Sequence, residues 1–80
     1  MAPLPRLQDA FGQVLKDLRT ERGLSQQQLA LDSELDRTYI SLLERGLRQP
    51  TLSTIFQLAE VLKFSASDIV ARVEKVVRRK

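Results

Sequence analysis

The stretch from Leu24 to Gly46, LSQQQLALDSELDRTYISLLERG, constrains the chain most, because it carries start and stop signals for two short helices. Ser25 is a favourable N-cap, and Gln28 can complete a capping box by reaching back to the Ser25 amide. Asp36 is the expected N-cap of the second helix, and Gly46 is a typical residue for its end. The stretch therefore predicts a first helix of about two turns, a tight turn and a second helix.

The second of these helices is apolar on one side only. Ile40 and Leu43 lie three residues apart and predict its buried face. Side chains that no core requires occupy the other faces, namely Arg37, Thr38, Ser41 and Leu42, with Tyr39 at the edge. A helix beginning Asp-Arg-Thr-Tyr offers donors and acceptors from its first turn, where a helix that enters a major groove end-on meets base edges. The pattern therefore indicates binding to DNA.

Further residues on both sides extend the pattern over nearly the whole chain, roughly residues 8 to 70. The elements are Arg19 before a Gly-Leu-Ser-Gln start, Leu29-Ala30, Ile40, Leu43-Glu44-Arg45-Gly46 and Pro50. Together they resemble the helix-turn-helix of the phage-repressor-like (Cro/repressor, or xenobiotic-response-element) family. The resemblance implies an all-α fold, a five-helix lambda-repressor-like DNA-binding domain with a central helix-turn-helix.

The turn between the two central helices departs from the family pattern. The family usually has a glycine there, because the turn demands a positive φ, whereas this chain has Glu34 after Ser33. A residue other than glycine in the left-handed region costs about 1–2 kcal/mol. The turn is therefore expected to be either slightly strained or differently shaped.

Helical periodicity continues outside the central stretch. A first helix, ending at Gly23 with Gly12 on an outer face, is predicted by the stripe Leu7, Phe11, Val14, Leu15 and Leu18. Thr51 caps a later helix whose inward stripe is expected to be Leu52, Ile55, Phe56, Ala59 and Leu62, with Leu58 alongside. Ser65 and Asp68 form a capping box for the last helix.

The last helix carries more apolar residues than a small core requires. One turn of its stripe suffices to close the core, and the remainder lies beside a basic face as apolar surface available to a partner. We therefore expect a homodimer whose interface comprises Ile69, Val73, Val76 and Val77. The alternative is a frayed helix trimmed from a longer protein.

Length and charge indicate one small domain. Its 80 residues divide into an N-terminal arm at residues 1–7, a DNA-binding domain at 8–71 and a basic end of the last helix at 72–80. Five basic residues and Glu74 give residues 72–80 a charge of +4, which leaves −1 for residues 1–71 of the total +3. Phosphate attraction must therefore come from local basic residues, helix N-termini or the basic tail.

The composition excludes several classes of function. The chain has neither cysteine nor histidine, so disulfides, thiolate metal sites, the usual zinc ligands and the usual general base are missing. We expect no enzyme activity, no cofactor and no metal. The sequence also lacks an apolar run of about 18 residues and a signal peptide, which predicts a cytoplasmic, nucleoid-associated protein with no membrane partner.

Five residues are candidates for DNA contacts on chemical grounds. Arg37 is best placed to pair in bidentate fashion with O6 and N7 of guanine. Gln26, with Gln27 sharing the contact, lies where helix amides and the helix dipole favour a phosphate. Arg45 and Arg48 flank the end of the second helix and are expected to contact the DNA backbone without reading sequence. The arginines could instead be solvated surface charge, and the glutamines could be no more than good helix formers.

The resemblance assigns roles to the remaining residues of the second helix. In the family, the positions of Thr38, Ser41 and Leu42 touch bases or a thymine methyl group. Tyr39 could stack on sugar and phosphate or bond a base, or it could be partly core.

The resemblance also implies two contacts between helices. The arginine at the position of Arg19 pairs in the family with a glutamate near the end of the recognition helix, here Glu44. Gln26 is expected to make a hydrogen bond toward the start of that helix. The alternative for Arg19 and Glu44 is two unrelated surface charges.

These expectations combine into a sequence-specific transcriptional regulator of a bacterium or phage, which binds an inverted repeat of double-stranded DNA as a dimer. Repression is the simplest mechanism, and acidic Asp32 and Glu34 are candidates for a contact with RNA polymerase. Controllers of restriction-modification operons, which share the fold, are one possible subclass. A second interpretation is an antitoxin that sequesters a protein toxin and autoregulates its operon.

Overall fold

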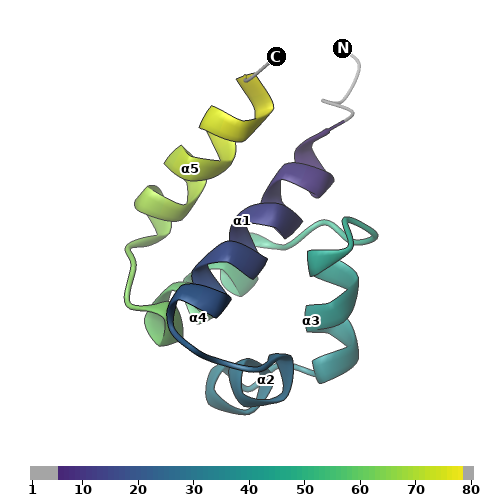
Figure 1. Ribbon diagram of the computed structural model, residues 1–80, viewed down its shortest axis with the longest axis vertical. Helices are drawn as coiled ribbons and strands as arrows, with labels where there is room; N and C mark the ends of the chain where they lie inside the picture. The colour runs from purple at the N-terminus through teal and green to yellow at the C-terminus, as the bar shows by residue number, and fades with distance from the viewer. Residues whose placement is uncertain (1–5, 79–80) are drawn as a thin grey trace.

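The computed structural model describes residues 6–78, which fold into five α-helices. They are α1 (Leu7–Glu21), α2 (Gln26–Ser33), α3 (Arg37–Glu44), α4 (Leu52–Leu62) and α5 (Ala66–Arg78) (Figure 1). The predicted all-α, five-helix class is confirmed. Of the predicted N-terminal arm, residues 1–5 lie outside the described residues, and Leu7 already belongs to α1.

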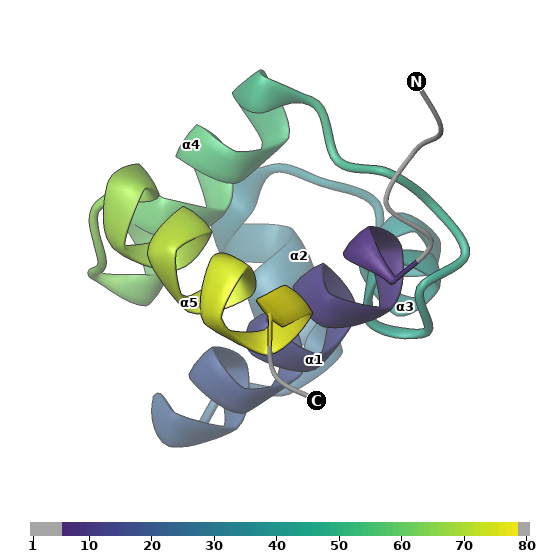
Figure 2. The same cartoon turned by 90° about the horizontal axis from the view of Figure 1, so that it is seen from above.

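Helix α1 lies at the centre of the arrangement. It packs against α3 on one side and against α5 on the other, and α5 runs back along it in the opposite direction (Figure 1 and Figure 2). Helix α2 packs on both α3 and α4 and so connects these two helices. The largest fully buried side chains are Leu15, Leu18, Leu29, Ile40, Leu43, Leu58 and Leu62. Every helix except α5 contributes to this set, so one core holds α3 in place.

The caps of the two central helices match the predicted positions but not all the predicted bonds. Ser25 is the N-cap of α2, and its hydroxyl accepts from the Gln28 amide at 3.0 Å. The Gln28 side chain, expected to return to Ser25, instead donates to Asp32 at 2.8 Å, because a partner one turn ahead lies within reach. Asp36 is the N-cap of α3, but its side chain makes no capping hydrogen bond.

The turn between α2 and α3 was expected to be either slightly strained or differently shaped. The structure has the slightly strained form. Glu34 has φ 60° and ψ 38°, the left-handed conformation that glycine adopts more easily. The turn is closed by the Leu35 amide, which donates to the Ala30 carbonyl oxygen at 2.9 Å. The expected turn therefore forms without its glycine, at a typical cost of about 1–2 kcal/mol.

Helix α4 presents a different face to the core from the one predicted. Leu52 and Phe56, expected inside, are 71% and 57% exposed, whereas Leu58 is buried. The buried face is centred on Leu58, which lies alongside Ala59 and Leu62. Because α4 is apolar on both sides, periodicity alone could not decide which side faces inward.

Helix α5 uses two of the four expected interface residues for the core of its own chain. Ile69 and Val73 are buried, because α5 lies along α1 and supplies the cover for that side of the core. They therefore have little surface left for a partner, and their place in a dimer interface stays a prediction. Val76 and Val77 are half-buried and also pack against the core.

Helices α1 and α3 approach each other closely at a glycine. Gly12 was expected on an outer face, but it is buried. A Cβ added there would lie 2.5 Å from the Leu43 carbonyl oxygen and 2.6 Å from that of Glu44. The absence of a side chain at residue 12 thus sets how near the end of α3 comes to α1.

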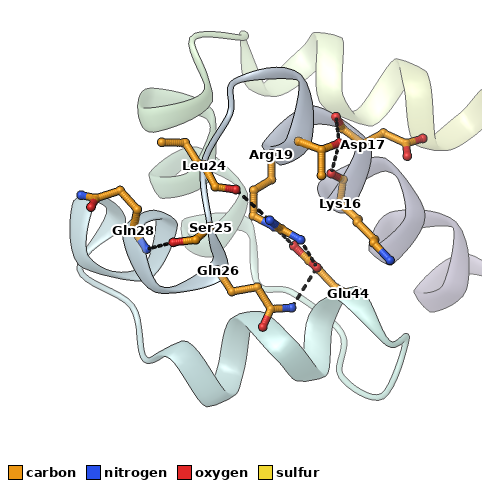
Figure 3. A network of polar contacts seen from close by, with 9 residues as sticks. Lys16, Asp17, Arg19, Leu24, Ser25, Gln26, Gln28 and Glu44 are labelled. Carbon is orange, nitrogen blue, oxygen red and sulfur yellow. Dashed lines mark hydrogen bonds and ion pairs between the residues drawn. The ribbon is translucent and has the colours of Figure 1, made fainter.

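An ion pair joins the same two helices (Figure 3). Arg19 donates from Nε to Glu44 Oε2 at 2.6 Å and from Nη2 to Glu44 Oε1 at 3.0 Å. The side chains are only 11% and 4% exposed. The hydrogen bond with the Glu44 carboxylate raises the pKa of Arg19 above its usual value, so the guanidinium stays charged.

The same cluster reaches α2. The third donor of Arg19, Nη1, is 2.7 Å from the carbonyl oxygen of Leu24, just before the Ser25 cap. Gln26 donates from Nε2 to Glu44 Oε1 at 3.0 Å. This partner lies at the end of α3, not toward its start as the resemblance implied. The cluster therefore fixes α1, α2 and α3 relative to one another.

Arg22, the C-cap residue of α1, ties down the end of α4 and the short loop that follows it. Arg22 donates from Nε to the Leu62 carbonyl oxygen at 2.7 Å, which satisfies a free carbonyl at the end of α4. Its guanidinium carbon lies 5.1 Å from the centre of the Phe64 ring, and that of Arg72 lies 4.9 Å from it. Both cations are thus within the range of cation–π attraction to one ring.

We predict that Gly12→Ala lowers the melting temperature, although alanine favours a helix by about 1 kcal/mol. The added methyl group would push α3 away, and we expect a net loss of about 1–2 kcal/mol, or about 4–15 °C. Thermal unfolding followed by circular dichroism measures this, with exposed Gln13→Ala as control. A higher melting temperature for Gly12→Ala would contradict the close approach.

We predict that Arg19→Ala destabilises the fold far more than loss of an exposed ion pair. It leaves the Glu44 carboxylate buried without its counterion, at a cost of about 3 kcal/mol or more. The control is Arg78→Ala, whose partner is Glu74 and whose pair is 75% and 61% exposed. Such a pair contributes at most about 1 kcal/mol. Equal urea midpoints for the two variants would show that the buried pair does not stabilise the fold.

Candidate nucleic-acid interface

Helix α3 has two faces with opposite character. Ile40 and Leu43 are completely buried and attach the helix to the core. Arg37 and Thr38 in the first turn are exposed, and Ser41 is half-buried one turn later. Leu42 is also half-buried. The inner face thus holds α3 rigidly while the outer face presents polar groups to whatever lies outside.

Tyr39 occupies the border between these faces. Its hydroxyl lies 3.2 Å from Oγ1 of Thr54, a buried residue of α4. Oγ1 of Thr54 is also 2.9 Å from Oγ1 of Thr51, the N-cap residue of α4. Of the alternatives for Tyr39, the structure shows a side chain that is half-buried and packs against the core. Sequence analysis missed Thr54, because a threonine among apolar residues gives no signal of its distant partner.

The start of α2 lies next to α3. The amide group of Gln26 is held by Glu44, as described above, and the side chain is half-buried. Gln27 is exposed in the same first turn. The first turn of a helix leaves backbone amides without helical partners and carries the positive end of the dipole. These two glutamines therefore flank a place where an anion is favoured.

The two arginines after α3 are both exposed. Arg45 is the C-cap residue of α3. Arg48 belongs to the loop before α4, and its Nη1 donates to the Leu47 carbonyl oxygen at 3.0 Å. Both guanidinium groups thus remain accessible near one end of α3, as Arg37 does at the other.

The charge around α3 is mixed. Asp32, Glu34 and Asp36 are exposed just before the helix, next to Arg37. A polyanion would therefore be attracted by the individual arginines and by the helix start, not by a uniformly basic surface. Within residues 6–78 the structure has no group of three or more acidic side chains placed to hold a metal ion. None of the helices described is long and apolar enough to span a membrane.

Comparison with known proteins matches this arrangement to one family. The sequence profile described as Helix-turn-helix matches residues 15–69. The control protein C.MunI of Mycoplasma sp is 38% identical over 66 residues, which cover 81% of this chain and 89% of that protein.

Two solved structures of controller proteins are also similar to this chain. The restriction-modification controller protein C.AhdI of Aeromonas hydrophila has a TM-score of 0.75 and 44% identity, covering 78% of this chain and 94% of that chain. The controller protein C.Esp1396I, solved as a tetramer in complex with its natural 35 base-pair operator, has a TM-score of 0.81 and 33% identity. It covers 91% of this chain and 96% of that chain. The chain therefore belongs to the helix-turn-helix family, in the phage-repressor-like group that its sequence resembles.

Proposed function

We propose that this protein is a sequence-specific regulator of transcription, a repressor or autoregulatory controller, that binds double-stranded DNA through the outer face of α3. The observation that supports this most strongly is the division of α3, with Ile40 and Leu43 completely buried and the first turn exposed. The related controller protein bound to its operator supports the same function. The regulator would act in the cytoplasm at the nucleoid.

In this proposal, different residues of α3 contact different groups of the DNA. Arg37 in the exposed first turn reads a guanine through its two parallel donors. Thr38, Ser41 and Leu42 contact neighbouring bases or a thymine methyl group. The ring of Tyr39 lies against sugar and phosphate while its hydroxyl stays with Thr54.

The remaining contacts position the protein on the DNA backbone. Gln26 and Gln27 present the start of α2 to a phosphate, where free amides add to the side-chain contacts. Arg45 and Arg48 contact phosphates beyond the other end of α3. Because these contacts ignore base identity, they set affinity and register, and the α3 side chains set sequence preference.

A dimer would use two such helices at once. Two recognition helices about 34 Å apart meet successive major grooves on one side of an inverted repeat. The exposed acids Asp32 and Glu34 then lie beside the DNA, where RNA polymerase is a candidate partner. Repression requires only that the bound dimer block the polymerase.

Site selection from random duplexes, followed by two arginine variants, tests this proposal. Arg37→Ala should relax preference at one base position in each half-site, with a loss of about 1–3 kcal/mol of discrimination. Arg48→Ala should weaken binding to all sequences alike and reduce the salt slope by about one.

Exposed Arg78→Ala on α5 serves as the control for loss of one positive charge. If Arg37→Ala and Arg48→Ala change sequence preference identically, the assignment of Arg37 to base recognition and of Arg48 to backbone contact is wrong. If the wild-type protein selects no duplex even at low salt, the proposed function itself fails.

A further inference from the structure

Thr54 is one of two polar residues that are buried among residues 6–78, and these two use their hydroxyls differently. The hydroxyl of the other, Ser33, donates to the Leu29 carbonyl oxygen at 2.6 Å, within its own helix. A helix commonly satisfies a buried serine in this way. The Thr54 hydroxyl instead lies 3.2 Å from the hydroxyl of Tyr39, on a different helix. Thr54 therefore makes a tertiary contact that α4 does not need for its own formation.

The Thr54 hydroxyl lies between two other hydroxyls. On one side is Tyr39, and on the other is Oγ1 of Thr51 at 2.9 Å. Thr51 Oγ1 also accepts from the Thr54 amide at 3.0 Å. Each hydroxyl has one proton to donate and two lone pairs that accept, so Tyr39 can donate to Thr54 while Thr54 donates to Thr51. The Tyr39 hydroxyl is thus linked through Thr54 to the N-cap of α4.

The bond between Tyr39 and Thr54 joins two helices that pack mainly on other neighbours. Helix α3 packs on α1 and α2, whereas α4 packs on α2 and α5. The Tyr39 side chain is half-buried and packs against the core on one side. A hydrogen bond at the far end of the side chain restricts the directions in which the ring can point. Thr54 therefore holds the exposed part of the ring in place.

The ring that Thr54 holds lies beside the residues proposed to read bases. Tyr39 follows Arg37 and Thr38, which are exposed in the first turn of α3. Thr54 itself is 5% exposed and has almost no surface with which to touch DNA. Its hydroxyl can therefore affect recognition only through the groups that it holds, and on α3 that group is Tyr39.

We propose that Thr54 is a positioning residue for DNA recognition, an inference that rests on the proposed function, in which α3 reads the DNA. Its hydroxyl holds the Tyr39 ring in one orientation, and this orientation sets the sequence preference at the base pair beside the ring. Contacts to base edges depend on geometry, so a ring that moves freely discriminates less. A buried residue of α4 thus contributes to specificity without touching the DNA.

The chain has one tyrosine and no tryptophan, which allows a first test without DNA. Fluorescence anisotropy decay of the full chain reports the motion of the Tyr39 ring alone. Thr54→Val keeps the size and branching of the side chain but removes the hydroxyl, and should add a fast component to the decay. Thr54→Ser keeps the hydroxyl and should behave as the wild type. Ser33→Ala removes a buried hydroxyl that bonds within α2, and this matched control should leave the decay unchanged.

The second test compares dissociation constants for the selected duplex and for duplexes changed at one base pair. Thr54→Val should reduce discrimination at one base pair in each half-site by about 3- to 10-fold, the typical contribution of one hydrogen bond. Thr54→Ser should restore the wild-type preference, and Ser33→Ala should keep it. Tyr39→Phe should cause the same loss as Thr54→Val. The double variant should lose no more, because both changes break the same bond.

Circular dichroism melts show whether each variant is folded. If Thr54 serves stability alone, Thr54→Val lowers the melting temperature but leaves the anisotropy decay and the sequence preference unchanged, which would overturn the inference. A faster decay with an unchanged preference would also overturn it. If Thr54→Val does not fold, Tyr39→Phe decides, since an unchanged preference in that variant would contradict the role of the bond.

Failure of this inference differs from failure of the proposed function. A wild type that binds no duplex would refute both. A wild type with a clear sequence preference that Thr54→Val and Tyr39→Phe leave intact would refute the positioning role of Thr54 alone.

Discussion

The buried ion pair between Arg19 and Glu44 is the constraint on which the geometry of this protein depends. It lies where three helices meet, and every donor of Arg19 that forms a bond there points to α3 or to the start of α2. Since a small domain has little core, a charged pair with several hydrogen bonds fixes orientation where apolar packing alone would allow sliding. Gly12 permits the close backbone approach that this pair needs.

Local signals were sufficient to predict most of the fold. Ser25 and Gly46 mark helix ends through short-range backbone geometry, and the structure has them at those places. The spacing of Ile40 and Leu43 identified the buried side of α3, because three residues nearly complete one turn. For the same reason, the exposed position of Arg37 followed from its place in the sequence.

The sequence predictions that failed concern features that depend on contacts between distant residues. The inward face of α4 is chosen by its packing on α2 and α5, so Phe56 looked as suitable for the core as Leu58 did. The partner of the Tyr39 hydroxyl is Thr54, on another helix. Gly12 was expected on an outer face of its helix, whereas the end of α3 packs against it. Periodicity along one segment contains no information on such neighbours.

The central claim is that α3, held from behind by its buried face, presents its outer face to DNA. The most direct measurement is an NMR titration of the ¹⁵N-labelled chain with a selected duplex, which reports on every backbone amide at once. The account predicts that the largest shifts fall on residues 25–27, 37–42 and 45–48, with α5 little changed. Shifts concentrated on the basic end of α5, from Arg72 to Arg78, with α3 unaffected, would contradict it.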